Sequence, residues 1–160
     1  MNRNNWLLVI LVLVLLAACG PRENCMAGHD PLSTHQMRIC ADKEKYDFGA
    51  PIHVTFTVTN ISDQPLVLDG GDEAAIDINV KGEHWSSERE LTPDLTRVTL
   101  DPGESRTLEW VWPTPQTDLE ALRVSFGEPG VLSIPVGGLV IPRPGASPGG
   151  VWVSAYYRRP

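Results

Sequence analysis

The chain has 160 residues, a formal net charge of −7 and 42% hydrophobic residues. This length suits one domain with a hydrophobic core of its own. The sequence has 13 Lys and Arg residues against 20 Asp and Glu, and no basic cluster, which argues against nucleic acid as a partner.

The amino-terminal segment is typical of a bacterial lipoprotein signal. Arg3 precedes an apolar run over residues 6–18 that closes on Leu16-Ala17-Ala18-Cys19. The run would make about 20 Å of helix, whereas a bilayer core needs roughly 20 residues, so a retained transmembrane helix is disfavoured. We expect cleavage before Cys19 and lipidation of its thiol, with an ordinary secretory signal or a short membrane anchor as the alternatives. The protein would then be lipid-anchored and extracytoplasmic, on the cell membrane or the outer membrane.

The two other cysteines then lie on the oxidising side of the membrane. Cys25 and Cys40 are therefore predicted to form a disulfide. In the chain-entropy model, a bridge that closes a loop of about 16 residues stabilises the fold by about 3 kcal/mol. The predicted organisation is a signal peptide over residues 1–18, a lipidated tether over 19–35 and a β domain over 36–160.

Most of the remaining chain alternates apolar and polar residues with a period of two. The clearest strand covers residues 52–59 and is followed by turn-forming residues 60–65, where Asn60-Ile61-Ser62 also fits a glycosylation acceptor. Only residues 118–122 suggest a helical turn. Seven or eight short strands predict an immunoglobulin-like antiparallel β-sandwich, with a small β-barrel as the alternative. The other expected strands lie near residues 37–41, 66–68, 76–80, 95–100, 107–112, 122–126 and 151–157.

Three pieces of this framework resemble a known family. They are Tyr46-Asp47-Phe48-Gly49-Ala50-Pro51 running into residues 52–60, Gly82-Glu83-His84-Trp85-Ser86, and residues 100–105 with Trp110. Over about residues 46–112 the chain resembles the BsuPI family, named for an intracellular proteinase inhibitor of Bacillus. The resemblance implies an immunoglobulin-like fold and proteinase inhibition. The chain departs from the family at residues 75–78, which lack its aromatic residues, and by a Ser in place of its second Trp.

The usual motifs of catalysis are missing. The sequence has no Gly-x-Ser-x-Gly, no His-Glu-x-x-His and no Cys-x-x-Cys, so we expect a non-catalytic protein without a cofactor or a metal. Two sets of possible metal ligands match no standard spacing and are interpreted as solvated loop residues and an acidic turn. These sets are His29, Asp30 and His35 in the first case and Asp69, Asp72, Glu73 and Asp77 in the second.

Residues 127–150 are half Gly or Pro, which argues against a regular central strand, yet they are rich in apolar residues. They predict either an irregular edge hairpin that fills the core or a protruding loop that binds a partner. Trp85, Trp110, Trp112 and Trp152 could form a sugar-stacking platform. Trp110 and Trp112 share the phase of Leu108, however, and are predicted to lie in the core, whereas Trp152 is predicted to be exposed. The candidate partner-binding residues are Val131, Leu132, Ile134, Val136, Leu139 and Trp152.

The predicted function follows from the anchor, the sandwich and the missing catalytic motifs. We expect a lipid-anchored module for binding or assembly in the cell envelope that is non-catalytic and recognises a protein partner. The membrane is contacted through the lipid on Cys19. Proteinase inhibition, carried by the family resemblance alone, is the alternative.

Overall fold

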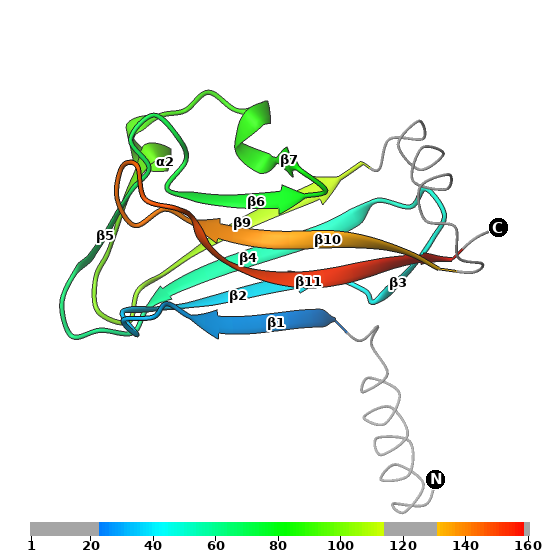
Figure 1. Cartoon of the computed structure of the whole chain (residues 1–160), viewed down its shortest axis with the longest axis horizontal. Helices are drawn as coiled ribbons and strands as arrows, with labels where there is room; N and C mark the ends of the chain where they lie inside the picture. Colours follow the sequence, from blue (N-terminus) through cyan, green and yellow to red (C-terminus); the bar gives the residue numbers. More distant parts are fainter. Residues whose placement is uncertain (1–22, 114–130, 159–160) are drawn as a thin grey trace, which may run out of the picture.

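The structure is a computed structural model that describes residues 23–113 and 131–158. Two β-sheets pack face to face, and a small two-stranded sheet lies at one end (Figure 1). The described residues form no closed barrel, so the predicted all-β sandwich is confirmed and the barrel alternative is not. Cys19 and the strand expected at residues 122–126 lie outside the described residues.

The first sheet is antiparallel throughout, and strand β4 has the alternation that the sequence predicts. Every second residue of β4 from Ile52 to Val58 is buried, and threonines point to the outer face. Hydroxyl pairs between Thr57 and Thr107 (3.0 Å) and between Thr59 and Ser105 (2.8 Å) join β4 to its neighbour on that face. In spatial order the strands are β1 (Asn24–His29), β2 (His35–Ala41), β4 (Ile52–Asn60) and β9 (Ser105–Trp112).

The second sheet contains one parallel pair, which departs from the predicted antiparallel pattern. Its short edge strand runs parallel to the end of β11, with Tyr46 opposite Tyr157. In spatial order its strands are β3 (Lys45–Asp47), β11 (Gly149–Arg158), β10 (Val131–Val140), β6 (Ile76–Val80) and β7 (Glu83–His84). The small sheet pairs β5 (Leu66–Asp69) with β8 (Arg97–Leu100).

Two short helical segments precede β8. They are the 3-10 helix η1 (Trp85–Glu88) and the single-turn helix α2 (Pro93–Thr96). Leu95 and Thr96 were expected to begin a strand, but they belong to α2, because Pro93 at its first position favours a helical start. The described residues hold eleven strands rather than seven or eight, since short pieces such as β3 and β7 carry no alternation that reasoning from the sequence could detect.

Strand β10 corrects the interpretation of the segment rich in Gly and Pro. It pairs with β11 along its whole length and with β6 along its second half, so it is a central strand. Pro135 is tolerated there because its carbonyl accepts a hydrogen bond from the Lys81 N–H (3.2 Å), just beyond the end of β6. In an antiparallel ladder the N–H and C=O of a residue face the same neighbouring strand. The N–H that proline lacks would therefore face β6, and no hydrogen bond between β10 and β11 is lost.

The pair Gly137-Gly138 makes room on both faces of β10. A Cβ on Gly138 would lie 2.1 Å from the ring of Phe56 in the facing sheet. A Cβ on Gly137 would lie 2.5 Å from the indole of Trp152 on the outer face. Neither glycine has a positive φ, so these positions need glycine for space and not for backbone conformation.

Strand β1 lies inside the segment predicted to be a tether. Cys25 and Cys40 stand opposite each other in the β1–β2 ladder and form the predicted disulfide. The Asn24 side-chain amide donates to the Ser154 carbonyl of β11 (2.6 Å), which ties this edge to the second sheet. The β domain therefore includes residues from Asn24 onward, rather than beginning at residue 36, and residues 20–23 lie between Cys19 and its first strand.

The opposite edge is joined by two tryptophans. Trp112 Nε1 donates to Glu83 Oε2 (2.7 Å), and Trp85 Nε1 donates to the Glu109 carbonyl (3.1 Å). Trp85, Trp110 and Trp112 are all buried, as predicted for the last two. These contacts attach β7 and η1 to β9 and fix the wall of the cavity described next.

Candidate functional site

The fold separates the residues predicted to bind a partner. Leu132, Ile134 and Val136 point into the core and are at most 5% exposed, which contradicts their assignment to a binding surface. Val131 begins β10. Leu139 is half-buried on the outer face of the second sheet, and Trp152 on the same face is 46% exposed, as predicted. The candidate surface is therefore the outer face of β10 and β11, because their inner faces fill the core.

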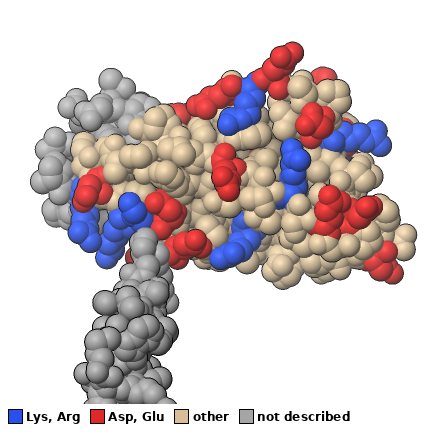
Figure 2. All heavy atoms as spheres, turned by 180° about the vertical axis from the view of Figure 1, so that it is seen from behind, with Lys and Arg blue, Asp and Glu red and all other residues tan. Residues whose placement is uncertain are grey.

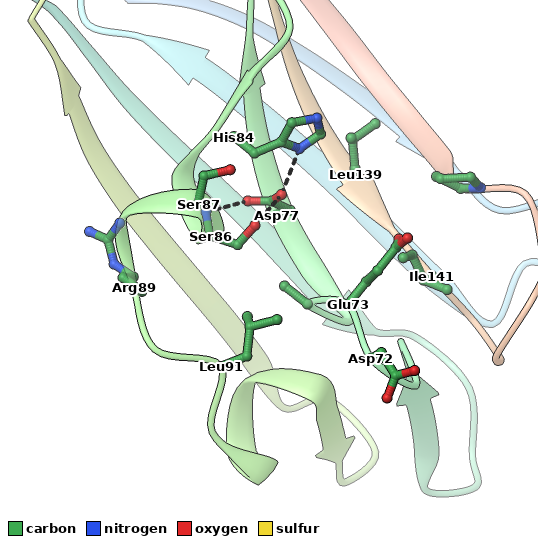
Figure 3. A pocket seen from close by; sticks show the side chains of 12 residues that line it. Asp72, Glu73, Asp77, His84, Ser86, Ser87, Arg89, Leu91, Leu139 and Ile141 are labelled. Carbon is green, nitrogen blue, oxygen red and sulfur yellow. Dashed lines mark hydrogen bonds and ion pairs between the residues drawn. The ribbon is translucent and has the colours of Figure 1, made fainter.

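A cavity of about 440 Å³ lies beside Leu139, between β6, β7, η1 and the loop that follows β10 (Figure 3). We call it the β6–β7 pocket. Apolar side chains, including Leu139 and Ile141, line one part of it, and the exposed carboxylates Asp72 and Glu73 line another. The remaining wall is a polar cluster centred on Asp77.

Asp77 is a buried carboxylate that accepts four hydrogen bonds. Oδ1 accepts from the backbone N–H groups of Ile78 (2.9 Å) and Ser86 (3.0 Å). Oδ2 accepts from Ser86 Oγ (2.8 Å) and from His84 Nδ1 (2.8 Å), as the dashed lines of Figure 3 indicate. A buried charge is tolerated when donors surround it in this way. Asp77 therefore ties β6, β7 and η1 together.

The second nitrogen of His84 is also occupied. The Asn79 side-chain amide donates to His84 Nε2 (3.0 Å), and the Gly82 N–H donates to Asn79 Oδ1 (3.0 Å), which fixes the orientation of the amide. The hydrogen bonds thus run in one direction, from Gly82 through Asn79 and His84 to Asp77. This direction assigns the imidazole proton to Nδ1.

Ser, His and Asp meet here in an arrangement that differs from a hydrolytic triad. In a triad, the serine hydroxyl donates to the histidine nitrogen that the aspartate leaves free. In this cluster Ser86 donates to Asp77, and Asn79 occupies the second nitrogen of His84. The arrangement holds the β6–β7 hairpin against η1, and the serine hydroxyl does not donate to the histidine.

Arg89, Asp72 and Glu73 line the pocket but do not pair with one another. Arg89 lies with its guanidinium 3.9 Å from the Trp85 ring centroid and 4.0 Å from Glu88. Within residues 23–113 and 131–158, no Lys, Arg or His forms an ion pair with Asp72 or Glu73. The pocket therefore offers two carboxylates next to an apolar surface.

The two sets of possible metal ligands are not gathered into sites. In the described part of the chain, one group of at least three possible ligands has its ligand atoms within 4.8 Å of one another. It consists of Glu23, Cys25 and Cys40, and the two sulfurs form the disulfide. Asp77, one of the possible calcium ligands, is committed to the hydrogen bonds above.

Asp30 and His35 order the β1–β2 turn. Asp30 accepts hydrogen bonds from the backbone N–H groups of Leu32, Thr34 and His35. Burial alone would raise the pKa of Asp30, but these donors and the nearby imidazole lower it below its usual value. Burial lowers the pKa of His35 against the opposing effect of the Asp30 carboxylate.

A second cavity, of about 570 Å³, lies between the β1–β2 turn and the β10–β11 loop. Its lining is more apolar and includes Met37, Leu66 and Val140. Leu32, also in its lining, is 83% exposed. The loop that joins β10 to β11 therefore separates two cavities at the same end of the sandwich.

The polar cluster was not recognised from the sequence, although a signal for it existed. Asp77 and Asn79 occupy the polar phase of the predicted strand at residues 76–80, so they share its outer face. A tight turn at Lys81-Gly82 then places His84 opposite Asn79. Two polar residues in phase before a hairpin turn predict such a cross-strand contact.

The chain matches no protein-family model, no curated protein and no solved structure. The resemblance to the BsuPI family therefore stays a prediction. No helix among the described residues is long and apolar enough to cross a membrane. The chemistry of the site has to be inferred from its geometry.

Proposed function

We propose that the protein is a lipid-anchored, non-catalytic binding module of the cell envelope that recognises a protein partner through the β6–β7 pocket. The anchor is supported by the motif that ends at Cys19. The observation that carries the binding role is the composition of the pocket: Asp77, His84 and Ser86 hydrogen-bond within one cluster, while Asp72 and Glu73 form no ion pair among the described residues and stand beside apolar side chains.

The anchor would hold this pocket away from the lipid. Residues 19–23 span at most roughly 17 Å when extended, and they lead into the start of β1. That end of the sandwich lies opposite the end with the β1–β2 turn and the β10–β11 loop (Figure 1). The β6–β7 pocket borders the β10–β11 loop, since Ile141 and Pro148 line it. A partner would thus approach from the envelope space.

The pocket favours a particular kind of side chain on the partner. A lysine or arginine could lay its aliphatic stem along Leu139 and Ile141 and place its charge near Asp72 and Glu73. The volume of the cavity is enough for a few side chains, which suits an anchor residue of a larger interface.

Mass spectrometry of membrane-extracted protein tests the anchor. We expect a mature amino terminus at Cys19 that carries a diacylglyceryl thioether, and a Cys19→Ala variant that is not lipidated. A chain that keeps residues 1–18, or that washes free of membranes without modification, would refute the anchor.

Crosslinking in envelope extracts tests the pocket. In the double variant Asp72→Lys/Glu73→Lys, the yield of crosslinked partner should fall by at least roughly tenfold. The new lysines would repel the lysine or arginine that the partner places in the pocket. Asp63→Lys, an exposed charge reversal in the β4–β5 turn, is the matched control and should retain it. The same partner captured equally by both variants would show that binding occurs elsewhere.

Proteinase inhibition stays a prediction of the family resemblance. The loop expected to enter a protease cleft contains strand β10, whose Leu132, Ile134 and Val136 are in the core. A protease panel titrated with the purified chain tests inhibition directly, and stoichiometric inhibition of any member would support it.

A further inference from the structure

Trp152 lies flat on the outer face of the second sheet. Its cross-strand partner is Gly137, and three atoms of the indole six-membered ring come within 2.7 Å of where a Cβ on Gly137 would stand. One face of the ring is thus pressed against the backbone of β10. Trp152 is 46% exposed, so the other face of its ring is open to solvent. Glycine is needed at position 137 for the ring to lie in this position.

The outward residues of β10 and β11 next to the indole are uncharged, while charged residues stand on the neighbouring strands, Asp77 of β6 opposite Leu139 and Lys45 of β3 opposite Tyr156. The outward positions of β10 and β11 within residues 133–139 and 150–156 are Ser133, Pro135, Gly137, Leu139, Gly150, Trp152, Ser154 and Tyr156. The hydroxyls of Ser133 and Ser154 have no hydrogen-bond partner among the described residues. Asn79 of β6 borders Gly137 on the other side.

The opposite face of the molecule differs. Figure 2, which views the molecule from behind, shows Lys and Arg side chains interspersed with Asp and Glu. The first sheet contributes Arg38 and Glu109 at outward positions. The outward residues of β10 and β11 around Trp152 thus differ from the outer face of the first sheet.

We propose that Trp152, seated on Gly137, is the stacking platform of a binding site for a neutral glycan. One face of a pyranose ring is a flat array of C–H bonds that carry partial positive charge, and it complements the electron-rich face of an indole. The hydroxyls of Ser133 and Ser154 supply hydrogen-bonding groups beside the ring, and the outward residues of β10 and β11 next to it are uncharged.

A glycan fits this surface better than a protein does. The core of a protein interface combines several apolar anchors, and hot-spot residues sit in pockets. This face has one strongly exposed large hydrophobic side chain among the described residues, Trp152. Its ring lies against the backbone of β10 and is not enclosed in a pocket. Stacking a sugar requires one such ring and little further apolar area. This site adjoins the β6–β7 pocket at Leu139 but does not use the carboxylates Asp72 and Glu73.

Isothermal titration of the full chain in detergent tests the proposal, with β-1,4-linked oligomers of glucose and of N-acetylglucosamine as probes. At least one series should bind, and Trp152→Ala should weaken it by roughly tenfold or more. Trp152→Leu should weaken it nearly as much, because leucine is apolar but has no flat face. Val111→Ala, an exposed apolar residue of β9, is the matched control and should bind like the unchanged chain.

Gly137→Ala gives an independent reading. The added Cβ would displace the indole while Trp152 remains, so glycan affinity should fall together with a change in the near-ultraviolet circular dichroism of the tryptophans. Thermal unfolding shows whether each variant is folded. If Gly137→Ala does not fold, the glycan affinity of Trp152→Leu tests the proposal instead. The proposal is overturned if neither series binds at millimolar concentration, or if Trp152→Leu binds as well as the unchanged chain.

Discussion

Strands β4 and β10 face each other across the core and fill it in opposite ways. β4 alternates large apolar residues with threonines, and its Phe56 is fully buried. β10 contains Gly137 and Gly138 in its middle, and the ring of Phe56 occupies the space that a Cβ on Gly138 would take. A glycine in a central strand can therefore be the complement of a large side chain in the other sheet.

The largest effect is expected from Gly138→Ala. The new Cβ would stand 2.1 Å from the Phe56 ring, so the two sheets must separate or the ring must leave its rotamer. Overpacking of this kind costs about 3 kcal/mol of unfolding free energy. Urea unfolding of the variant and of the unchanged chain measures the difference.

Two controls isolate the contact between Phe56 and Gly138. Gly149→Ala adds the same methyl group at a site where the nearest atom is 4.0 Å away, and it should change stability by less than about 0.5 kcal/mol. Phe56→Leu should recover part of the loss when combined with Gly138→Ala. Additive costs in that double variant would mean that the two residues do not share the space described.

The end of β4 gives the next effect. Asn60 is fully buried, and its side-chain amide donates to the carbonyls of Gln64 (2.8 Å) and Leu100 (2.9 Å) while its oxygen accepts from Ser62. Asn60→Ala would leave these groups without partners and should cost about 2 kcal/mol. Asn60→Asp keeps the acceptor but cannot donate, so a similar loss is expected. A melting temperature unchanged in both variants would contradict the structural role of the amide.

The buried amide also settles how residues 60–62 should be interpreted. Asn60-Ile61-Ser62 fits a glycosylation acceptor in the sequence, but Nδ2 of Asn60 is used inside the fold. The turn that the sequence predicted there is confirmed. Period two was sufficient to place β4, β9 and β11, because in each of them a single face is buried and the apolar residues mark it.

Residues 131–140 could not be placed by the same reasoning. Gly137 and Gly138 contribute no side chain to the pattern, and the space they leave becomes visible only when Phe56 and Trp152 are in position. For the candidate site, exposure of Trp152 could be predicted from its phase. The polar cluster of Asp77 and His84 depends on a register that β6 and β7 acquire only in the folded hairpin.

A smaller effect is expected from pH at the strand that neighbours β4. His35 stands opposite Asn60 in the β2–β4 ladder, and burial lowers its pKa below the ordinary 6.5. The unfolded chain therefore binds a proton at a higher pH than the folded chain does, so stability should fall as the pH falls below about 6.5. Asp30, whose pKa is also lowered, should add to the loss below pH 3.8.

His35→Gln measures the histidine contribution. Urea unfolding at a series of pH values should show a flatter dependence between pH 6.5 and 4 for the variant than for the unchanged chain, whatever its stability at neutral pH. Equal slopes would assign the acid sensitivity to other groups.

The smallest effect is expected from Pro135→Ala, and it tests why β10 can be central at all. Because the nitrogen of Pro135 faces the end of β6, the substitution does not affect a hydrogen bond to β11. The free energy of unfolding should fall by less than about 1 kcal/mol, because alanine gives the unfolded chain more conformational entropy than proline does. The new N–H would point toward Lys81, the residue whose own N–H already donates to the carbonyl at position 135. Amide hydrogen exchange should then show no change in the protection of residues 151–157 of β11. A gain of several kcal/mol, or new protection along β11, would mean that the proline had been interrupting the β10–β11 ladder and that β10 fits its sheet less regularly than its register implies.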